Sequence, residues 1–312
     1  MKVGLILLPA RMRYIVNMAS EIFSDDVRYL SFTKVEAIGN NLILVDALLL
    51  PDMNWPLLAK RMCSHHFGIG ADGLLVLLPA SRGDIRMRMF NPDGTEDACG
   101  NGLRCSAAYA RITGLSASNH IVFETNDGLH VADVLGVDDK LAMVKVNMGR
   151  PCFCPSDLPA KFGDDRLMDY PLQIDGQEYR INCVKIGTPH AVIFAPKEFF
   201  WDEIPSVSPL IEVHPAFPER TNITWCAVES PNSLYVRTWE RAVGPTLGCG
   251  TGACSALIAA KLRGLAGSNA KVTSPGGFLD IQWPDEGEVI MSGPARLVFK
   301  ARWPLTGDER NQ

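Results

Sequence analysis

The 312-residue sequence contains no apolar run of the roughly 18 residues that a membrane-spanning helix needs. Its N-terminal apolar stretch, VGLILLPA at residues 3–10, is too short and ends without a clear small-residue cleavage site. Basic residues flank this stretch, as they would in a targeting leader. We nevertheless expect residues 1–30 to be an N-terminal extension or a start-site artefact, and we expect no membrane association.

The sequence also lacks an excess of basic residues. It has 30 Lys and Arg residues and 35 Asp and Glu residues, for a net charge of −5. Without a basic footprint, nucleic acid is not an expected partner. Apolar residues make up 47% of the chain and charged residues 21%, which allows a substantial buried core. The length suits one large domain or two domains of about 150 residues each.

The nine cysteines include no Cys-x-x-Cys pair, and their number is odd. A secreted disulfide framework is therefore not expected, and the composition favours a reducing, cytoplasmic setting. The clusters Cys152-Phe153-Cys154 and Cys63-Ser64-His65-His66 match no structural zinc spacing, so we expect no metal site.

Long helical patterns are scarce in this sequence. The two best helical segments, residues 103–112 and 253–263, are rich in Ala, Leu and Ser and carry few charges. Such helices are apolar nearly all round and should be buried. Alternating or β-rich patterns predict strands at residues 74–78, 85–89, 120–124, 141–146 and 234–239.

A near-repeat is present: CGNGLRCSAA begins at Cys99 and CGTGACSALI begins at Cys249. Each phrase follows a predicted strand that ends in a polar residue, and each precedes a predicted buried helix and a further strand. This order, occurring twice, predicts two similar halves. Two related halves commonly hold a ligand between them.

Cys-Gly-x-Gly at a helix start is a chemically specific arrangement. Unpaired backbone N–H groups and the helix dipole favour the thiolate form of a cysteine there. The glycines let the backbone approach a ligand, and their N–H groups can hold a carboxylate.

Two such thiols, one from each half, suit inversion at the carbon next to a carboxylate. One thiolate would remove the α-hydrogen and the other thiol would deliver a proton to the opposite face. Backbone donors would stabilise the intermediate charge, and we place these at Gly100, Asn101, Gly250 and Thr251.

Other interpretations of the cysteines stay open. Buried cysteine is usually an inert small hydrophobe. We interpret four of them in that way: Cys105, Cys183, Cys226 and Cys254. Oxidation could also join Cys99 and Cys249 in a disulfide, which would stop the chemistry.

Several ordered motifs resemble those of the diaminopimelate epimerases, a family of cofactor-independent amino-acid epimerases with two catalytic cysteines. The resemblance covers about Phe32 to the C-terminus. The motifs are Phe32-Thr33-Lys34 with Gly39-Asn40, His66-Phe67-Gly68-Ile69-Gly70-Ala71-Asp72-Gly73, Asn91-Pro92-Asp93-Gly94-Thr95-Glu96, Cys99-Gly100-Asn101-Gly102, Gly187-Thr188-Pro189-His190, Phe217-Pro218-Glu219-Arg220-Thr221-Asn222, Glu240-Arg241 and Cys249-Gly250-Thr251-Gly252.

The resemblance implies that Cys99 and Cys249 are the acid–base pair and that His190 and Glu240 are their partners in proton exchange. It also implies substrate contacts from Asn40, Asn91, Asn222 and Arg241. Read from the residues alone, these last positions could equally be turn formers, caps or a surface ion pair.

The fold implied by the resemblance is α+β. Two similar domains would each wrap a curved, mixed or antiparallel sheet round a central helix. The expected boundaries are 31–147 for the first domain, with the strand 297–312 returning to it, and 148–296 for the second.

Several positions depart from the family pattern, including Ala242 and Val243, and the spacing from Asn91 to Cys99 is one residue shorter than usual. Thr188 stands where the family usually has Asn, Asn41 where it usually has Asp, and Pro245 where it usually has Glu. A threonine is shorter than asparagine and offers no amide, so Thr188 puts the contact to the far end of the substrate in doubt.

The predicted reaction is interconversion of LL- and meso-2,6-diaminoheptanedioate, without pyridoxal phosphate or metal, for lysine and peptidoglycan precursor supply. The expected partner is a small amino-acid substrate, and a homodimer is left open. Alternatives are a related racemase for another amino acid, a non-catalytic metabolite-binding relative, and a redox-sensing thiol pair.

Overall fold

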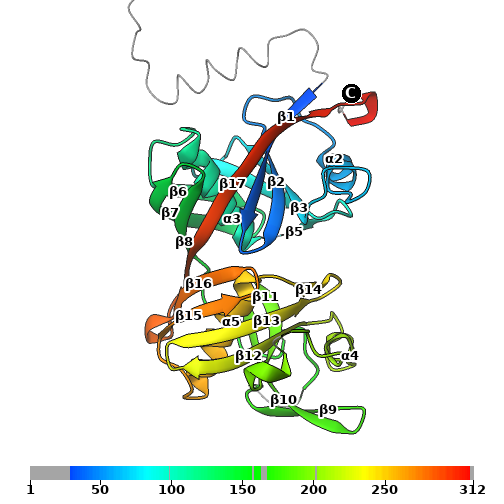
Figure 1. Ribbon diagram of the computed structural model, residues 1–312, viewed down its shortest axis with the longest axis vertical. Coiled ribbons are helices and arrows are strands. Elements are labelled where there is room, and N and C mark those ends of the chain that lie inside the picture. Colours follow the sequence, from blue (N-terminus) through cyan, green and yellow to red (C-terminus); the bar gives the residue numbers. More distant parts are fainter. Residues whose placement is uncertain (1–28, 98, 157, 163–166, 201, 310–312) are drawn as a thin grey trace, which may run out of the picture. The chain divides into compact units, whose positions relative to one another are not determined.

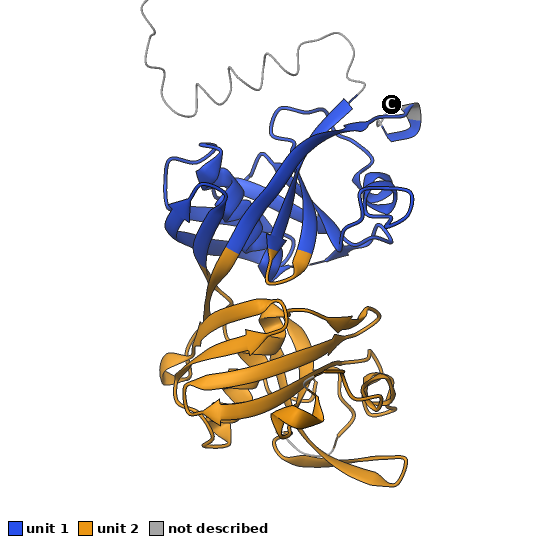
Figure 2. Cartoon of the chain, viewed as in Figure 1, with its two compact units in different colours: residues 1–36, 41–144, 295–312 blue, residues 37–40, 145–294 orange. Residues whose placement is uncertain are grey.

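A computed structural model describes residues 29–97, 99–156, 158–162, 167–200 and 202–309. Most of the expected N-terminal extension therefore lies outside the described residues. The chain forms two compact units (Figure 2). The first contains residues 29–36, 41–144 and 295–309 of the described chain, and the second contains 37–40 and 145–294.

The first unit combines a mixed sheet with two helices (Figure 1). Its strands are β1 (Tyr29–Ala37), β2 (Asn40–Asp46), β3 (Gly73–Leu78), β4 (Ile85–Phe90), β5 (Glu96–Asp97), β6 (His120–Thr125), β7 (Gly128–Asp138), β8 (Leu141–Asn147) and the end of β17 (Ile290–Pro304). Its helices are α2 (Trp55–Met62) and α3 (Gly100–Ile112), with a 3-10 turn η3 (Gly307–Glu309). Strand β2 pairs parallel with β3, and β4 pairs parallel with β6.

The second unit has the same kinds of element. Its strands are β9 (Tyr170–Ile174), β10 (Gln177–Ile186), β11 (Thr188–Phe194), β12 (Asn222–Ser230), β13 (Ser233–Glu240), β14 (Gly244–Thr246), β15 (Asn269–Ser274), β16 (Gly277–Gln282) and the start of β17. Its helices are α4 (Ser208–Glu212) and α5 (Gly250–Leu262), with 3-10 turns η1 (Lys197–Phe199) and η2 (Pro284–Glu286). Strand β11 pairs parallel with β12, and β13 pairs parallel with β15.

The repeat seen in the sequence is also a repeat of topology. In the first unit α3 connects the β4–β5 pair to β6, which runs parallel to β4. In the second unit α5 connects the β13–β14 pair to β15, which runs parallel to β13. The α+β fold class predicted from the sequence is confirmed.

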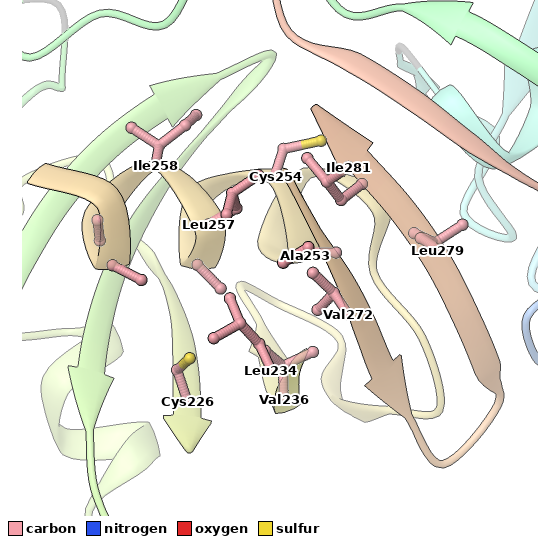
Figure 3. Close-up of a cluster of buried hydrophobic side chains, with 14 of the residues drawn as sticks. Cys226, Leu234, Val236, Ala253, Cys254, Leu257, Ile258, Val272, Leu279 and Ile281 are labelled. Carbon is pink, nitrogen blue, oxygen red and sulfur yellow. The ribbon is translucent and has the colours of Figure 1, made fainter. Parts of the chain in front are cut away.

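Helix α5 is the centre of the core of the second unit. Its residues from Gly252 to Ala260 are buried, and Cys254, Leu257 and Ile258 pack among strand side chains (Figure 3). Helix α3 is likewise buried from Asn101 to Ala110. The prediction of two buried helices is confirmed, but each helix begins three residues earlier than predicted, because the glycines of Cys-Gly-x-Gly are themselves helical.

The short turn at residues 37–40 packs with the second unit rather than with the strands on either side of it. Ile38 and Gly39 both have positive φ, at 49° and 85°. A Cβ at Gly276 would collide with the backbone carbonyl of Ile38, so only glycine fits at position 276. This close packing gives Asn40 to the second unit while the rest of β2 belongs to the first.

Asp46, at the end of β2, is a buried carboxyl whose ionisation opposes folding. It is 7% exposed, and its Oδ1 accepts a hydrogen bond from the Leu48 N–H at 3.2 Å. Burial raises the pKa of Asp46 from 3.8 to about 6, although hydrogen bonds from Leu48 and Tyr109 act in the opposite direction. The native state therefore keeps a proton that the unfolded chain releases, and stability falls as the pH rises through this window.

We expect Asp46→Asn to remove this pH dependence, because asparagine does not ionise. Relative to the variant, the wild-type free energy of unfolding should fall by up to roughly 3 kcal/mol between about pH 4 and pH 7. Urea unfolding of both proteins across that range measures the difference, with the exposed Asp202→Asn as the control. Parallel pH profiles for wild type and Asp46→Asn would contradict the prediction.

Among the described residues, no helix combines the length and the apolar character that a membrane crossing requires.

Candidate active site

The cysteines of the two repeated phrases occupy the same local geometry. Cys99 is the N-cap of α3, with φ −145° and ψ 105°, and its Sγ accepts a hydrogen bond from the Gly102 N–H at 3.2 Å. Cys249 is the N-cap of α5, with φ −124° and ψ 117°, and its Sγ accepts from the Gly252 N–H at 3.4 Å. Each sulfur therefore uses a backbone donor that the helix leaves unpaired, an arrangement that favours negative charge on sulfur.

The second glycine of each phrase is closely packed against neighbouring side chains. A Cβ at Gly102 would lie 2.7 Å from Leu75 Cδ2, and a Cβ at Gly252 would lie 2.7 Å from Thr238 Oγ1. The sequence analysis explains these glycines only by their approach to a ligand, and the structure adds a packing reason. Both helix starts are pressed against neighbouring side chains.

The surroundings of Cys249 favour its thiol form. The residue is 7% exposed. Burial is the main cause that raises its pKa well above 9.0, and the negative charge and hydrogen bond of Glu240 raise it further. Hydrogen bonds from the Thr251 hydroxyl and the Gly252 N–H act in the opposite direction. The Sγ to Thr251 Oγ1 distance is 3.3 Å.

Glu240 is brought to Cys249 by the end of β13. It is the last residue of that strand, and the hydroxyl of Thr246 donates a hydrogen bond to its Oε1 at 2.8 Å. Thr246 belongs to β14, which pairs with β13. The carboxylate that raises the thiol pKa is thus fixed by the two strands that lead into α5.

His190 is completely buried on β11 and surrounded by hydroxyl groups. Its Nδ1 lies 3.0 Å from Thr224 Oγ1, and its Nε2 lies 2.9 Å from Thr251 Oγ1 and 3.2 Å from Thr188 Oγ1. Burial, followed by the positive charge of Arg241, lowers the pKa of His190 to about 3. The ring is therefore neutral, and Thr251 connects it to Cys249.

Asn222 and Arg241, both predicted substrate contacts, are held against the same strand ends. The side-chain amide of Asn222 donates to the Pro189 carbonyl at 2.8 Å, and its Oδ1 accepts from the Arg241 N–H at 2.8 Å. The Arg241 guanidinium donates to the Glu219 carbonyl at 3.3 Å. Asn222 thus tethers β11 to the backbone of the residue after β13, and the Glu219 carbonyl holds the Arg241 guanidinium.

The predicted residues of the first unit have structural contacts of their own. Asn101 is buried, and its Oδ1 accepts from the fully buried Arg104 guanidinium at 2.7 Å. Asn91 donates through its amide to Thr95 Oγ1 at 3.0 Å and closes a turn with the Thr95 carbonyl. Gly100 is the first residue of α3, as Gly250 is of α5. In the second unit, the buried Oδ1 of Asn40 has no hydrogen-bond partner among the described residues.

The second unit therefore joins five predicted site residues through direct contacts: Cys249, Glu240, His190, Thr188 and Thr251. Two more, Asn222 and Arg241, contact each other, and the charge of Arg241 acts on His190. Four residues near predicted site residues were missed by the sequence interpretation: Thr224, Thr238 and Thr246 in the second unit and Arg104 in the first. The first three are strand threonines whose alignment depends on register, in which Thr238 opposes both Thr224 and Thr246. Nothing in the local sequence marks them.

All nine cysteines, which fall within the described ranges, are present as thiols. Burial raises the pKa of Cys105, Cys183 and Cys226, which supports their interpretation as inert core residues. The described part of the chain contains no cluster of three or more His, Cys, Asp or Glu side chains placed to hold a metal ion.

Solved structures with the same fold include a phenazine biosynthesis protein of the PhzF family from Bacillus anthracis. It matches with a TM-score of 0.66 at 16% identity, covering 89% of this chain and 100% of that one. A hydroxyproline epimerase from Agrobacterium vitis matches with a TM-score of 0.65 at 16% identity, covering 89% and 93% of the two chains. At this identity the likeness shows the fold alone.

Sequence relatives are much closer. A diaminopimelate epimerase from Pelotomaculum thermopropionicum is 42% identical over 279 residues, covering 88% of this chain and 98% of the relative. Another from Desulforudis audaxviator is 42% identical over 278 residues, covering 88% and 99%. The sequence profile of the family described as diaminopimelate epimerase matches residues 32–154 and 182–298. The chain belongs to the diaminopimelate epimerase family.

Proposed function

We propose that this protein interconverts LL- and meso-2,6-diaminoheptanedioate by acid–base chemistry between two cysteines, without a cofactor or metal. The observation that carries the proposal is the repeated N-cap geometry. Cys99 and Cys249 both place Sγ within 3.2–3.4 Å of a backbone N–H at the start of a buried helix. The family relationship supplies the substrate.

In the proposed reaction, one cysteine as thiolate takes the α-hydrogen as a proton and becomes a thiol. The electron pair left on the carbon is spread over the substrate carboxylate. The other cysteine as thiol then protonates the opposite face of that carbon and becomes a thiolate. No oxidant or reductant is needed, and the reverse reaction exchanges the two roles.

Backbone donors at the two helix starts stabilise the intermediate in this proposal. Gly100 and Asn101 would provide them from α3, and Gly250 and Thr251 from α5. The proposal requires both thiols to reach opposite faces of one stereocentre when substrate is bound. Both belong to one chain, so the chemistry is the same in a monomer or a homodimer.

Glu240 is the proposed proton-exchange partner of Cys249, because its carboxylate forms a hydrogen bond to that thiol. His190 belongs to the same machinery and acts on Cys249 through Thr251. Asn40, Asn91, Asn222 and Arg241 are the proposed contacts to the rest of the substrate. We also propose that the protein works in the cytoplasm, where nine thiols would stay reduced.

A related racemase for another amino acid is the second candidate, and Thr188 favours it. The family usually has asparagine at this position. Here the Thr188 hydroxyl is engaged by His190 and Thr251, so it is turned toward the helix start. A substrate with a different far end would suit the loss of the amide.

Deuterium uptake at Cα from D₂O, followed by proton NMR, tests both candidates. We expect exchange with LL- and meso-diaminopimelate and none with proline, hydroxyproline or glutamate. Exchange with one of the others, and none with diaminopimelate, would transfer the assignment to the second candidate. Ligand binding without exchange of any substrate would contradict both and indicate a non-catalytic relative.

A further inference from the structure

A file of hydrogen-bonding groups runs from Cys249 into the core of the second unit. Cys249 Sγ lies 3.3 Å from Thr251 Oγ1, which lies 2.9 Å from His190 Nε2. On the far side of the ring, Nδ1 lies 3.0 Å from Thr224 Oγ1, which lies 3.4 Å from Thr238 Oγ1. Four elements contribute: α5, β11, β12 and β13.

The file is packed tightly against the start of α5. A Cβ at Gly252 would lie 2.7 Å from Thr238 Oγ1, 3.0 Å from Thr224 Oγ1 and 3.3 Å from His190 Cε1. The glycine therefore makes room for both hydroxyls and the imidazole beneath the helix start. Thr224, Thr238 and His190 are all buried, so water does not compete for their hydrogen bonds.

The direction of hydrogen-bond donation along the file is set by the neutral imidazole of His190 and by Cys249. The imidazole is neutral, so one ring nitrogen donates and the other accepts. At Cys249 the thiol hydrogen is directed to the carboxylate of Glu240, which can only accept. The sulfur lone pairs then face the Gly252 N–H and the Thr251 hydroxyl, and both of these groups donate to sulfur.

The remaining orientations follow from the donation by Thr251. With its hydrogen directed at sulfur, Oγ1 of Thr251 offers lone pairs to its other neighbours, so His190 Nε2 carries the ring hydrogen. Nδ1 is then an acceptor, and the Thr224 hydroxyl donates to it. Thr224 in turn accepts from Thr238, across a distance that makes this last bond weak. Thr188, 3.1 Å from Thr251 Oγ1, provides a second donor to that oxygen.

We propose that His190 and these threonines form a one-way donor chain that ends at Cys249 Sγ and stabilises the thiolate left when Cys249 gives its proton to the substrate carbon. This inference rests on the proposed function. Thr251 touches the reacting sulfur, whereas Thr188, Thr224 and Thr238 are positioning residues. His190 acts as a neutral hydrogen-bond donor and does not itself take the proton.

The donor chain acts on Cys249 Sγ in the direction opposite to burial and Glu240. Within the described residues of the second unit, burial and Glu240 favour the thiol of Cys249, and burial, followed by the positive charge of Arg241, keeps His190 neutral. A donor chain without net charge can stabilise the thiolate without competing with Glu240 for the proton. Cys249 can therefore still donate its proton as a thiol, and the hydrogen bonds lower the free energy of the thiolate that remains.

The first test needs no substrate. ¹⁵N NMR of the full chain labelled at histidine reports which nitrogen of His190 carries hydrogen, and His190→Gln assigns the signal among the six histidines. We expect the Nε2–H form in the wild type and a mixture of both forms in Thr224→Val, which loses the donor to Nδ1. A wild-type Nδ1–H form, or a protonated ring, would overturn the proposal.

The second test measures the thiolate of Cys249 directly. The rate of its alkylation by iodoacetamide is followed by peptide mass spectrometry from about pH 6 to pH 10. Thr251→Val should reduce the thiolate fraction roughly tenfold at a fixed pH, and Thr224→Val roughly threefold. Thr251→Ser retains the hydroxyl and should restore the wild-type profile.

Ser255→Ala is the matched control for this series. Ser255 lies in the same helix, and its buried hydroxyl has no hydrogen-bond partner among the described residues. Removing it should leave the alkylation profile unchanged. An equal shift in Ser255→Ala and Thr251→Val, or no shift in either threonine variant, would overturn the proposal. Because neither readout involves turnover, failure here is distinguishable from failure of the proposed epimerase activity.

Discussion

Replacing Cys249 with alanine is expected to lower the rate of epimerisation by at least about a thousandfold while one half of the reaction survives. Acid–base catalysis by a positioned side chain contributes roughly 10²–10⁴-fold, and in the proposed mechanism Cys249 provides one of the two proton transfers. Cys99 retains its N-cap geometry and its bond from Gly102. It should still remove and return the α-hydrogen on its own face.

The expected result is therefore stereochemically selective. The variant should exchange the α-hydrogen of one configuration with D₂O and retain that configuration, and it should not exchange the other. Cys99→Ala should show the opposite selectivity. Proton NMR of separate LL- and meso-diaminopimelate samples in D₂O measures both exchange and epimerisation.

Two further variants distinguish a loss of catalysis from a loss of folding. Cys249→Ser retains an N-cap acceptor for the Gly252 N–H, yet its hydroxyl is far too weak an acid to replace the thiol. It should be as slow as the alanine variant. Cys254→Ala changes a fully buried cysteine of the same helix and should retain turnover. Epimerisation near the wild-type rate in Cys249→Ser would refute the two-thiol mechanism.

The repeated phrase made much of the fold and the cysteine positions predictable. Cysteine followed by two glycines and a run of Ala and Leu can form a buried helix start on local grounds alone, and the twofold occurrence indicated two similar halves. The ordered motifs added the family. The burial of α3 and α5 and the N-cap role of Cys99 and Cys249 agree with those expectations.

The surroundings of Cys249 could not be predicted in the same way. Thr224 and Thr238 come from different strands, and only the β12–β13 register places them opposite each other. Threonine is common in strands, so its presence there carries no signal of function. The packing of the turn at residues 37–40 could not be predicted either, because its contact with Gly276 joins segments more than two hundred positions apart in the sequence.

Thr188 is a departure from the family pattern whose contacts the sequence does not show. The missing amide predicts a lost contact at the far end of the substrate. The structure adds that the shorter side chain hydrogen-bonds His190 and Thr251. Thr188 therefore belongs to the group of hydroxyls beside Cys249, a placement that the sequence does not indicate.

Replacing Glu240 with glutamine is expected to increase the thiolate fraction of Cys249 while it lowers turnover by roughly a hundredfold. After burial, the charge of Glu240 is the largest cause that raises the pKa of Cys249. Removing that charge lowers this pKa, so more thiolate is present at any fixed pH below the wild-type pKa. Glutamine can still accept from Thr246, so the local structure should be retained.

Turnover should fall because Cys249 must begin one direction of the reaction as a thiol and must exchange its proton with a neighbouring base. Alkylation of Cys249 by iodoacetamide should become faster, whereas kcat should drop with little change in KM. Glu229→Gln, which removes a surface carboxylate paired with Lys197, should change neither quantity.

Faster alkylation together with undiminished kcat would show that Glu240 only restrains the thiolate. Unchanged or slower alkylation would show that the charge of Glu240 does not disfavour the thiolate of Cys249. Only the opposed pair of changes, with more thiolate and less turnover, identifies Glu240 as the group that exchanges the proton.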